Sequence, residues 1–209
     1  MPARHRYCIL QLRLPGTAAG VWHKETLCRY VQGCAEASGQ INDNPKISDI
    51  MITEKLEKAF NDQITAELWS SNLYLQMAFY LQKEGWDGFA HWMNKQSEEE
   101  REHAIELAGY LVKRGGTANV SMIDVVPDGW GSVEEVFKHV YEHECHVSQL
   151  INDLVDVAAA EKDKASQDFL WGFVREQVEE EATAQSILEK VKRASNGGLF
   201  FIDSQLAKR

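Results

Sequence analysis

The sequence predicts an all-α fold: a four-helix bundle with one long crossover connection and a short fifth helix at its C-terminal end. Apolar residues recur at alternating steps of three and four positions from residue 53 onward, the pattern of helices packed side by side. Only 4 prolines occur in 209 residues, and 44% of the residues are hydrophobic. The chain therefore suits long helices around a buried core.

The first two predicted helices form a hairpin. One runs from about residue 53, with Thr53 as its N-cap, to about residue 83, and the other from about residue 87 to residue 114, before two glycines. The few residues between them require an antiparallel pair. Their inward-facing positions, here called seam positions, are Phe60, Ile64, Glu67, Ser71, Tyr74, Ala78 and Leu81, then Phe89, Met93, Gln96, Glu100, His103, Leu107 and Tyr110.

The third and fourth predicted helices form a second hairpin. The third begins at a capping box, Ser132 with Glu135, and the fourth runs from about residue 163 to residue 193. Their seam positions are Val133, Phe137, Val140, Glu144, Val147, Ile151, Leu154 and Ala158, then Leu170, Phe173, Gln177, Glu180, Ala184, Ile187 and Val191. After two further glycines, the apolar segment 199–206 predicts the short fifth helix.

The connection between the two hairpins decides the topology. Residues 115–131 show no helical period, and seventeen extended residues span about 55 Å, enough to return along a bundle about 40 Å long. We therefore expect the second and third helices to run parallel, joined by a crossover.

Each predicted seam carries a carboxylate near the middle of its helix, and none carries Lys or Arg. The carboxylates are Glu67, Glu100, Glu144 and Glu180, and His103 and Gln177 lie at the same depth. A single seam glutamate is more often a salt-bridged or edge residue, but four buried together without a cation would cost many kcal/mol or require protonation. The sequence therefore predicts a metal ion in the middle of the bundle, and oxygen ligands with one imidazole suit iron, manganese or zinc.

Several polar residues lie beside these seams. Glu99, Glu176 and Glu179 are candidates for a third, weaker cation site at the edge of the central layer. We expect Cys145 to be a packed thiol. We expect the three histidines of the third helix to face solvent: His139, His143 and His146.

The charge of the chain is unevenly distributed. The net charge of −10 argues against nucleic-acid binding through a basic surface, and no apolar run reaches the roughly eighteen residues of a membrane span. Residues 1–46 carry six basic and three acidic residues, a net of +3, which leaves −13 for the remainder. We expect residues 1–46 to be a disordered extension and residues 47–209 to be the bundle domain. A transit peptide and a translation start at Met51 are two other interpretations of the same composition.

The cysteines indicate the compartment. Three of the 4 cysteines, Cys8, Cys28 and Cys34, fall in residues 1–46, and no Cys-x-x-Cys motif occurs. This pattern makes a poor disulfide framework, so we expect a reducing compartment, the cytoplasm.

Five stretches from Met51 onward resemble the bacterial non-haem ferritins. ITAELWSSNLY, QSEEEREHA, YEHECHVSQLIN and FVREQVEEE look like the segments that hold the ferroxidase centre in that family, and GLFFIDSQL looks like its C-terminal helix. The resemblance makes residues 47–209 a ferritin-like diiron domain. It implies oxidation of Fe(II) to Fe(III) by dioxygen or peroxide, and storage of ferric mineral in a hollow homo-oligomeric shell of about 24 subunits.

The resemblance also assigns roles to residues of this sequence. It places Glu67 and His103 at the first iron, Glu100 as a bridge, and Glu144 with Gln177 at the second iron. A third site would take Glu99, Glu176, Glu179 and Glu180, with Glu180 near the second iron as well. Tyr74 matches the family's tyrosine beside the diiron centre; the alternative is an ordinary core aromatic.

The sequence differs from related ferritin-like families at several positions, and these differences narrow the choice of family. Bacterioferritins and rubrerythrins repeat Glu-x-x-His on a second helix, whereas Val147 stands three residues after Glu144. Arg101 stands where bacterioferritins place a haem-ligating methionine, so haem is not expected. Some relatives carry a tryptophan at the position of Gly172, and here Trp171 is displaced from it by one residue.

Two other functions are compatible with a metal-binding bundle. One is a non-storing diiron oxidase or peroxidase, and the other is a structural bundle with a zinc or manganese plug. An enzyme for an organic substrate would need an apolar channel to the metal layer. The seams offer few small residues for one, namely Ser71, Ala78, Ala158 and Ala184, so storage is favoured.

Overall fold

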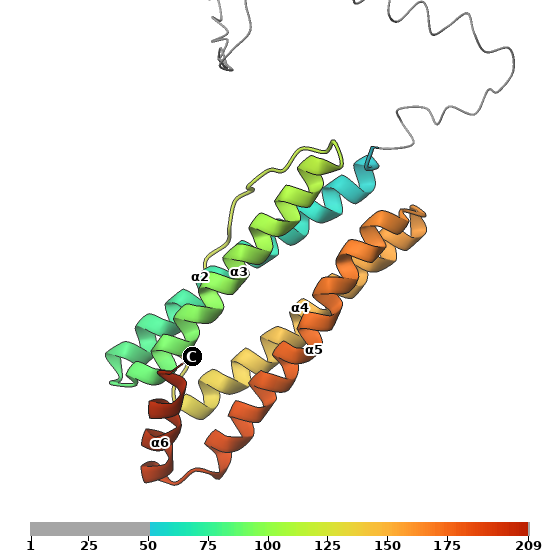
Figure 1. The fold of residues 1–209 in the computed structure, drawn as a ribbon. Coiled ribbons are helices and arrows are strands. Elements are labelled where there is room, and N and C mark those ends of the chain that lie inside the picture. Colours follow the sequence, from blue (N-terminus) through green and yellow to red (C-terminus); the bar gives the residue numbers. More distant parts are fainter. Residues whose placement is uncertain (1–50, 209) are drawn as a thin grey trace, which may run out of the picture. The chain divides into compact units, whose positions relative to one another are not determined.

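A computed structural model describes residues 51–208 of the protein, apart from the side chain of Asn196, and these residues form five helices and no strands (Figure 1). The helices, labelled as in Figure 1, are α2 (Glu54–Lys83), α3 (Asp87–Lys113), α4 (Val133–Ala160), α5 (Lys164–Arg193) and α6 (Asn196–Leu206). The predicted all-α fold with a short C-terminal helix is thus confirmed. The extension expected over residues 1–46, with Cys8, Cys28 and Cys34, lies outside the described residues.

Local capping interactions explain where the long helices begin. The Thr53 hydroxyl accepts a hydrogen bond from the Leu56 amide at 3.3 Å, as expected of an N-cap. Ser132 and Glu135 form the predicted capping box at the start of α4. Asp163 caps α5 by accepting from the Ser166 amide at 3.0 Å. At the end of α3 the chain turns through Gly115, whose φ of +79° favours glycine.

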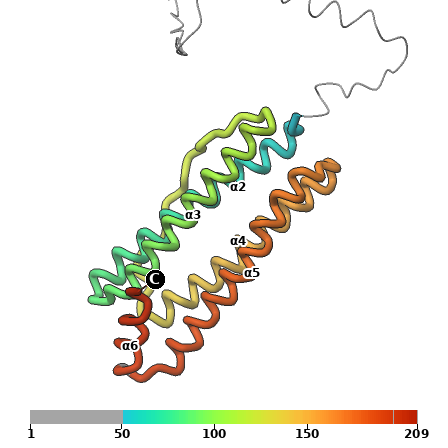
Figure 2. Tube along the Cα trace, in the orientation of Figure 1, coloured from blue at the N-terminus to red at the C-terminus, as the bar shows by residue number. Residues whose placement is uncertain are grey.

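The helices pack as two antiparallel hairpins, α2 with α3 and α4 with α5 (Figure 2). Helix α2 also packs against α4, and α6 packs mainly against α3. The crossover segment between α3 and α4 is fastened to α2 near both of its ends. The Asn61 amide donates to the Thr117 carbonyl at 2.9 Å, and the Tyr80 hydroxyl donates to the Gly131 carbonyl at 2.7 Å.

The hydrophobic core consists of two clusters separated along the bundle. One cluster contains Leu81, Phe89, Phe137 and Ile187, and the other contains Phe60, Leu107, Ile151 and Leu170. The residues between these two groups along each helix include the predicted central carboxylates. The bundle therefore has apolar packing on both sides of a polar layer, and this packing keeps water from reaching the layer along the bundle axis.

No helix in the described part of the chain is both long enough and apolar enough to cross a membrane. Cys145 on α4 is a free, half-buried thiol.

Candidate metal centre

All four long helices contribute buried polar side chains to the central layer. Helix α2 supplies Glu67, α3 supplies Glu100, α4 supplies Glu144 and α5 supplies Gln177, with exposed fractions of 1%, 3%, 1% and 6%. These residues lie near the middles of their helices, as the seam pattern predicts. Burial this complete is unusual for glutamate unless it is paired or bound to a metal.

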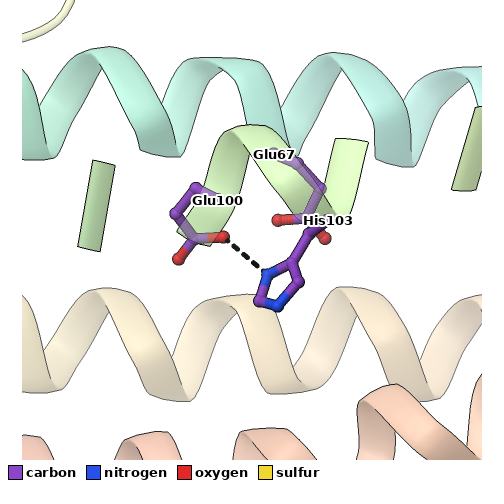
Figure 3. Close-up of side chains that lie close together, drawn as sticks. All are labelled: Glu67, Glu100 and His103. Carbon is purple, nitrogen blue, oxygen red and sulfur yellow. Dashed lines mark hydrogen bonds and ion pairs between the residues drawn. The ribbon is translucent and has the colours of Figure 1, made fainter. Parts of the chain in front are cut away.

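Two of these side chains, Glu67 and Glu100, converge with His103 on one point. Glu67, Glu100 and His103 each offer a ligand atom, and the three atoms lie within 4.8 Å of one another. Figure 3 shows the Glu100 carboxylate facing the His103 ring, with the Glu67 carboxylate beside them. His103 Nδ1 lies 3.2 Å from Glu100 Oε2, because the i, i+3 spacing on α3 points both side chains the same way. This group of three is called the Glu67 cluster below.

One oxygen of the Glu67 cluster lacks a hydrogen-bond partner. The Gln63 amide donates to Glu67 Oε1 at 2.8 Å, whereas Glu67 Oε2 is buried without any partner. A buried, unpartnered carboxylate oxygen is costly in a folded protein. A cation bound to the cluster would satisfy it, so the donor set fits a hard metal ion such as iron.

The protonation of the Glu67 cluster reflects crowded acids in a dry interior. Burial and the neighbouring Glu100 carboxylate raise the pKa of Glu67 to about 8. Burial also raises the pKa of Glu100. Burial by itself would lower the pKa of His103, but the hydrogen bond that His103 donates to Glu100 and the charges of nearby glutamates raise that pKa to about 10. The cluster therefore holds extra protons in the absence of a metal, and a cation would displace them.

A second set of contacts surrounds Glu144 on α4. The Tyr74 hydroxyl donates to Glu144 Oε1, and the Gln177 amide donates to Glu144 Oε2 at 3.2 Å. Burial raises the pKa of Glu144 to about 7, although both hydrogen bonds oppose the shift. Burial and the charge of Glu144 raise the pKa of Tyr74 well above its usual value. Tyr74 is fully buried, and it is hydrogen-bonded directly to Glu144, a predicted metal ligand.

The acids predicted for a third site are placed differently. Glu176 Oε1 lies 3.3 Å from His103 Nε2, and Glu180 Oε2 accepts from the Gln96 amide at 3.0 Å. Glu179 is exposed and Glu99 is half-buried. Over residues 51–208, the Glu67 cluster is the one group of three or more acidic, histidine or cysteine side chains brought close enough to hold a metal. The third site therefore stays a prediction.

The sequence did not reveal the hydrogen bonds that two glutamine side chains make in the layer. Gln63 and Gln96 donate hydrogen bonds to Glu67 and Glu180. The position of Gln63 four residues before Glu67, one helical turn away, is the signal that could have identified it. Gln96 was counted as a seam residue, but no local pattern shows that its amide reaches across to α5.

The expectation that His143 faces solvent is wrong. His143 is half-buried, and its Nε2 lies 2.9 Å from the Ser70 hydroxyl oxygen on α2. Its ring lies 5.6 Å from that of Trp69 and 5.8 Å from that of Tyr74. Burial lowers the pKa of His143 to about 4. The packing of α2 on α4 covers this flank of α4, whereas His139 and His146 are exposed as expected.

Comparisons with known proteins agree with this fold and this arrangement. A match to the family described as Ferritin-like domain covers residues 57–194. A bacterial non-heme ferritin of Bacteroides fragilis (strain 638R) is 68% identical over 159 residues, which are 76% of this chain and 100% of the relative. A probable bacterial non-heme ferritin-like protein of Haemophilus influenzae is 38% identical over 158 residues, covering 75% of this chain and 96% of the relative.

A solved ferritin structure is also similar to this chain. An open pore ferritin from the hyperthermophilic archaeon Archaeoglobus fulgidus has 42% sequence identity to the chain and a TM-score of 0.74. The similarity covers 76% of this chain and 98% of the archaeal chain. At this identity the likeness extends beyond the general shape of a helical bundle.

Proposed function

Because this chain belongs to the ferritin family, we propose that it is an iron-storage protein that oxidises Fe(II) to Fe(III) at the Glu67 cluster before ferric mineral is deposited. Membership in the family supports iron storage. The ferroxidase activity, the diiron site and the shell are the further parts of the proposal.

The observation that carries the proposal is the buried, unpartnered Oε2 of Glu67 beside Glu100 and His103. Carboxylate oxygens and one imidazole are ligands that suit Fe(II), and no thiolate belongs to the cluster. The excess of carboxylates also suits an ion that becomes more positive on oxidation, because negative ligands stabilise Fe(III) relative to Fe(II).

In this proposal each side chain of the layer has a role. Glu67 and His103 bind the first Fe(II), Glu100 bridges to the second, and Glu144 and Gln177 bind the second. Tyr74 donates a hydrogen bond to Glu144 and so orients that carboxylate. The third site comprises the acids Glu99, Glu176, Glu179 and Glu180.

The electrons balance with either oxidant. Two Fe(II) ions give one electron each, and dioxygen takes both electrons with two protons to become hydrogen peroxide. With hydrogen peroxide as the oxidant, two electrons and two protons cleave the O–O bond and give two waters. The protein fixes the positions and charges of the two ions, so that both electrons leave together.

Assembly and location are also part of the proposal. We propose a hollow homo-oligomeric shell of about 24 copies in the cytoplasm, as ferritin membership and the cysteine pattern suggest. A net charge of −10 favours the attraction of cations over that of nucleic acids.

The test is the amount of iron bound per chain. Fe(II) is added in large excess in air, the protein is passed over a sizing column, and iron and protein are measured in the eluted particle. Storage requires far more iron per chain than the ligand sites can bind, in a large soluble particle. Loading that stops at about two ions per chain would instead identify a non-storing diiron oxidase.

Site variants connect this activity to the cluster. Glu67→Gln and His103→Ala are expected to slow Fe(II) oxidation at least about tenfold, because each removes a ligand of the first iron. Glu102→Gln is the matched control, since Glu102 is an exposed acid on the same helix as His103. Equal oxidation rates in the wild type and the two cluster variants would refute the assignment of the site.

A further inference from the structure

Both ring nitrogens of His103 face carboxylates from different helices. Nδ1 lies 3.2 Å from Glu100 Oε2 on α3, within the Glu67 cluster. Nε2, on the other side of the ring, lies 3.3 Å from Glu176 Oε1 on α5. The imidazole therefore spans the space between the metal-binding face of α3 and the acidic face of α5.

Helix α5 restrains the imidazole in two ways. Phe173, three residues before Glu176, packs edge-on against the His103 ring, with centroids 5.5 Å apart and planes at 68°. Because residues three apart lie on one helical face, Phe173 limits the tilt of the ring while Glu176 holds its remote nitrogen. The His103 side chain is 12% exposed and that of Glu176 is 48% exposed, so Glu176 approaches the ring from the solvent side.

A histidine ligand must offer an unprotonated nitrogen to the metal. Nδ1 faces Glu100, so the proton of the metal-binding tautomer belongs on Nε2, where a carboxylate can accept it. In metal sites such an N–H to carboxylate hydrogen bond fixes the ring and makes the ligating nitrogen a stronger donor.

We propose that Glu176 is a positioning residue, which accepts a hydrogen bond from His103 Nε2–H and thereby aims Nδ1 at the first metal ion. The inference rests on the proposed function, because it takes the Glu67 cluster as the metal site. This role is additional to the third-site role proposed above, which Glu176 shares with Glu179 and which does not involve the His103 ring. A positioning role predicts that the loss of Glu176 weakens the first site itself.

The test measures binding of Co(II) alone, under anaerobic conditions, so that no oxidation is involved. Titration followed by the visible absorption of Co(II) gives both the affinity of the tightest site and the geometry of its ligands. Glu176→Ala is expected to weaken that affinity about 10- to 100-fold and to change the absorption spectrum. Glu176→Gln is expected to recover most of the affinity, because its amide oxygen still accepts from Nε2–H.

Two further variants make the outcome decisive. Asp168→Ala removes an exposed acid elsewhere on α5 and is expected to bind Co(II) as the wild type does. Glu179→Ala removes another predicted third-site acid without touching the ring. If Glu176 acts only at a third site, Glu176→Ala and Glu179→Ala will leave the tightest site equally unchanged, and the inference is wrong.

His103→Ala separates this inference from the proposed function. If His103→Ala abolishes the tightest Co(II) site but Glu176→Ala leaves it unchanged, the inference fails and the metal site stands. If His103→Ala also leaves the site unchanged, the assignment of the Glu67 cluster fails, and the inference fails with it.

Discussion

Gly88 on α3 lies directly against Asp203 on α6. A β-carbon added to Gly88 would come within 1.8 Å of the Asp203 backbone oxygen. The Asp203 carboxylate accepts a hydrogen bond from the Phe89 amide at 2.8 Å, and so caps the start of α3, where Trp86 supplies no side-chain cap. The docking of α6 therefore depends on a glycine in one helix and an acid in another.

Gly88→Ala is expected to detach α6 from α3, because backbone atoms cannot give way by the distance required. The variant should unfold at a lower temperature, and protease should cut it between α5 and α6. Gly109→Ala is the matched control on α3, because its β-carbon would meet nothing within 4 Å. There the higher helix propensity of alanine should stabilise the protein by up to about 1 kcal/mol. Equal stability of the two variants would refute the docking role.

The buried acid Glu67 should make the metal-free protein less stable as pH rises. The pKa of Glu67 is raised from 4.5 to about 8, mainly by burial. Between these values the folded protein keeps a proton that the unfolded chain releases, so the free energy of unfolding falls with increasing pH. Glu67→Gln removes this contribution. In excess chelator, the variant should gain stability over the wild type as pH rises from 5 to 8.

The quantity to compare in that experiment is the difference in the free energy of unfolding between Glu67→Gln and the wild type at each pH. His143, with its pKa lowered by burial to about 4, contributes a slope of the opposite sign. The unfolded chain takes up a proton on this histidine below about pH 6.5, so His143 destabilises the fold as pH falls toward 4. The effect is present in both proteins and cancels. A constant stability difference from pH 5 to pH 8 would contradict the prediction for Glu67.

Asp163 should stabilise the end of the bundle where α5 begins. Its carboxylate caps α5 and accepts hydrogen bonds from the two terminal guanidinium nitrogens of Arg114, at 3.0 and 2.7 Å. Burial would raise the pKa of Asp163, but the Arg114 hydrogen bonds lower it below 3.8. The stabilisation is therefore present above pH 3.8 and is lost as pH falls through the lower folded value.

Asp163→Ala should reduce the free energy of unfolding by about 1–3 kcal/mol at pH 7, through the lost cap and charged hydrogen bonds. Denaturant unfolding measures the loss. Asp62→Ala is the comparison, since Asp62 pairs with Lys58 at the surface and such pairs contribute less than about 1 kcal/mol. The prediction fails if both variants lose the same small amount.

Tyr74→Phe tests the hydrogen bond to Glu144. The ring still packs edge-on against Trp92, with centroids 6.3 Å apart, but the buried carboxylate loses its hydroxyl donor. We expect the metal-free protein at pH 8 to lose about 1–3 kcal/mol of stability. A metal ion bound to Glu144 should reduce this loss. If Tyr74 is an ordinary core aromatic, thermal unfolding will show no loss in either state.

The sequence was sufficient to predict the helices because their signals are local. Thr53, Ser132 and Asp163 mark helix starts through side chains that cap amides within three residues. Apolar spacing then identified the inward face of each helix, and the length of the crossover gave the topology. The same periodicity placed Glu67 and Glu100 in the interior, where the structure also places them.

Only the tertiary structure decided how the interior side chains meet. Periodicity fixes a residue to a helical face, but the rotation and contact of neighbouring helices determine which atoms touch. For this reason the sequence did not show that Glu67 Oε2 lacks a partner, that Glu176 reaches the remote nitrogen of His103, or that α2 covers His143. Local propensity and spacing predicted the burial of Glu67, Glu100 and Glu144, whereas Glu180, predicted for the same buried layer, is only half-buried. Packing between helices determined which of them converge on one point, because that depends on distances across the bundle that no local pattern encodes.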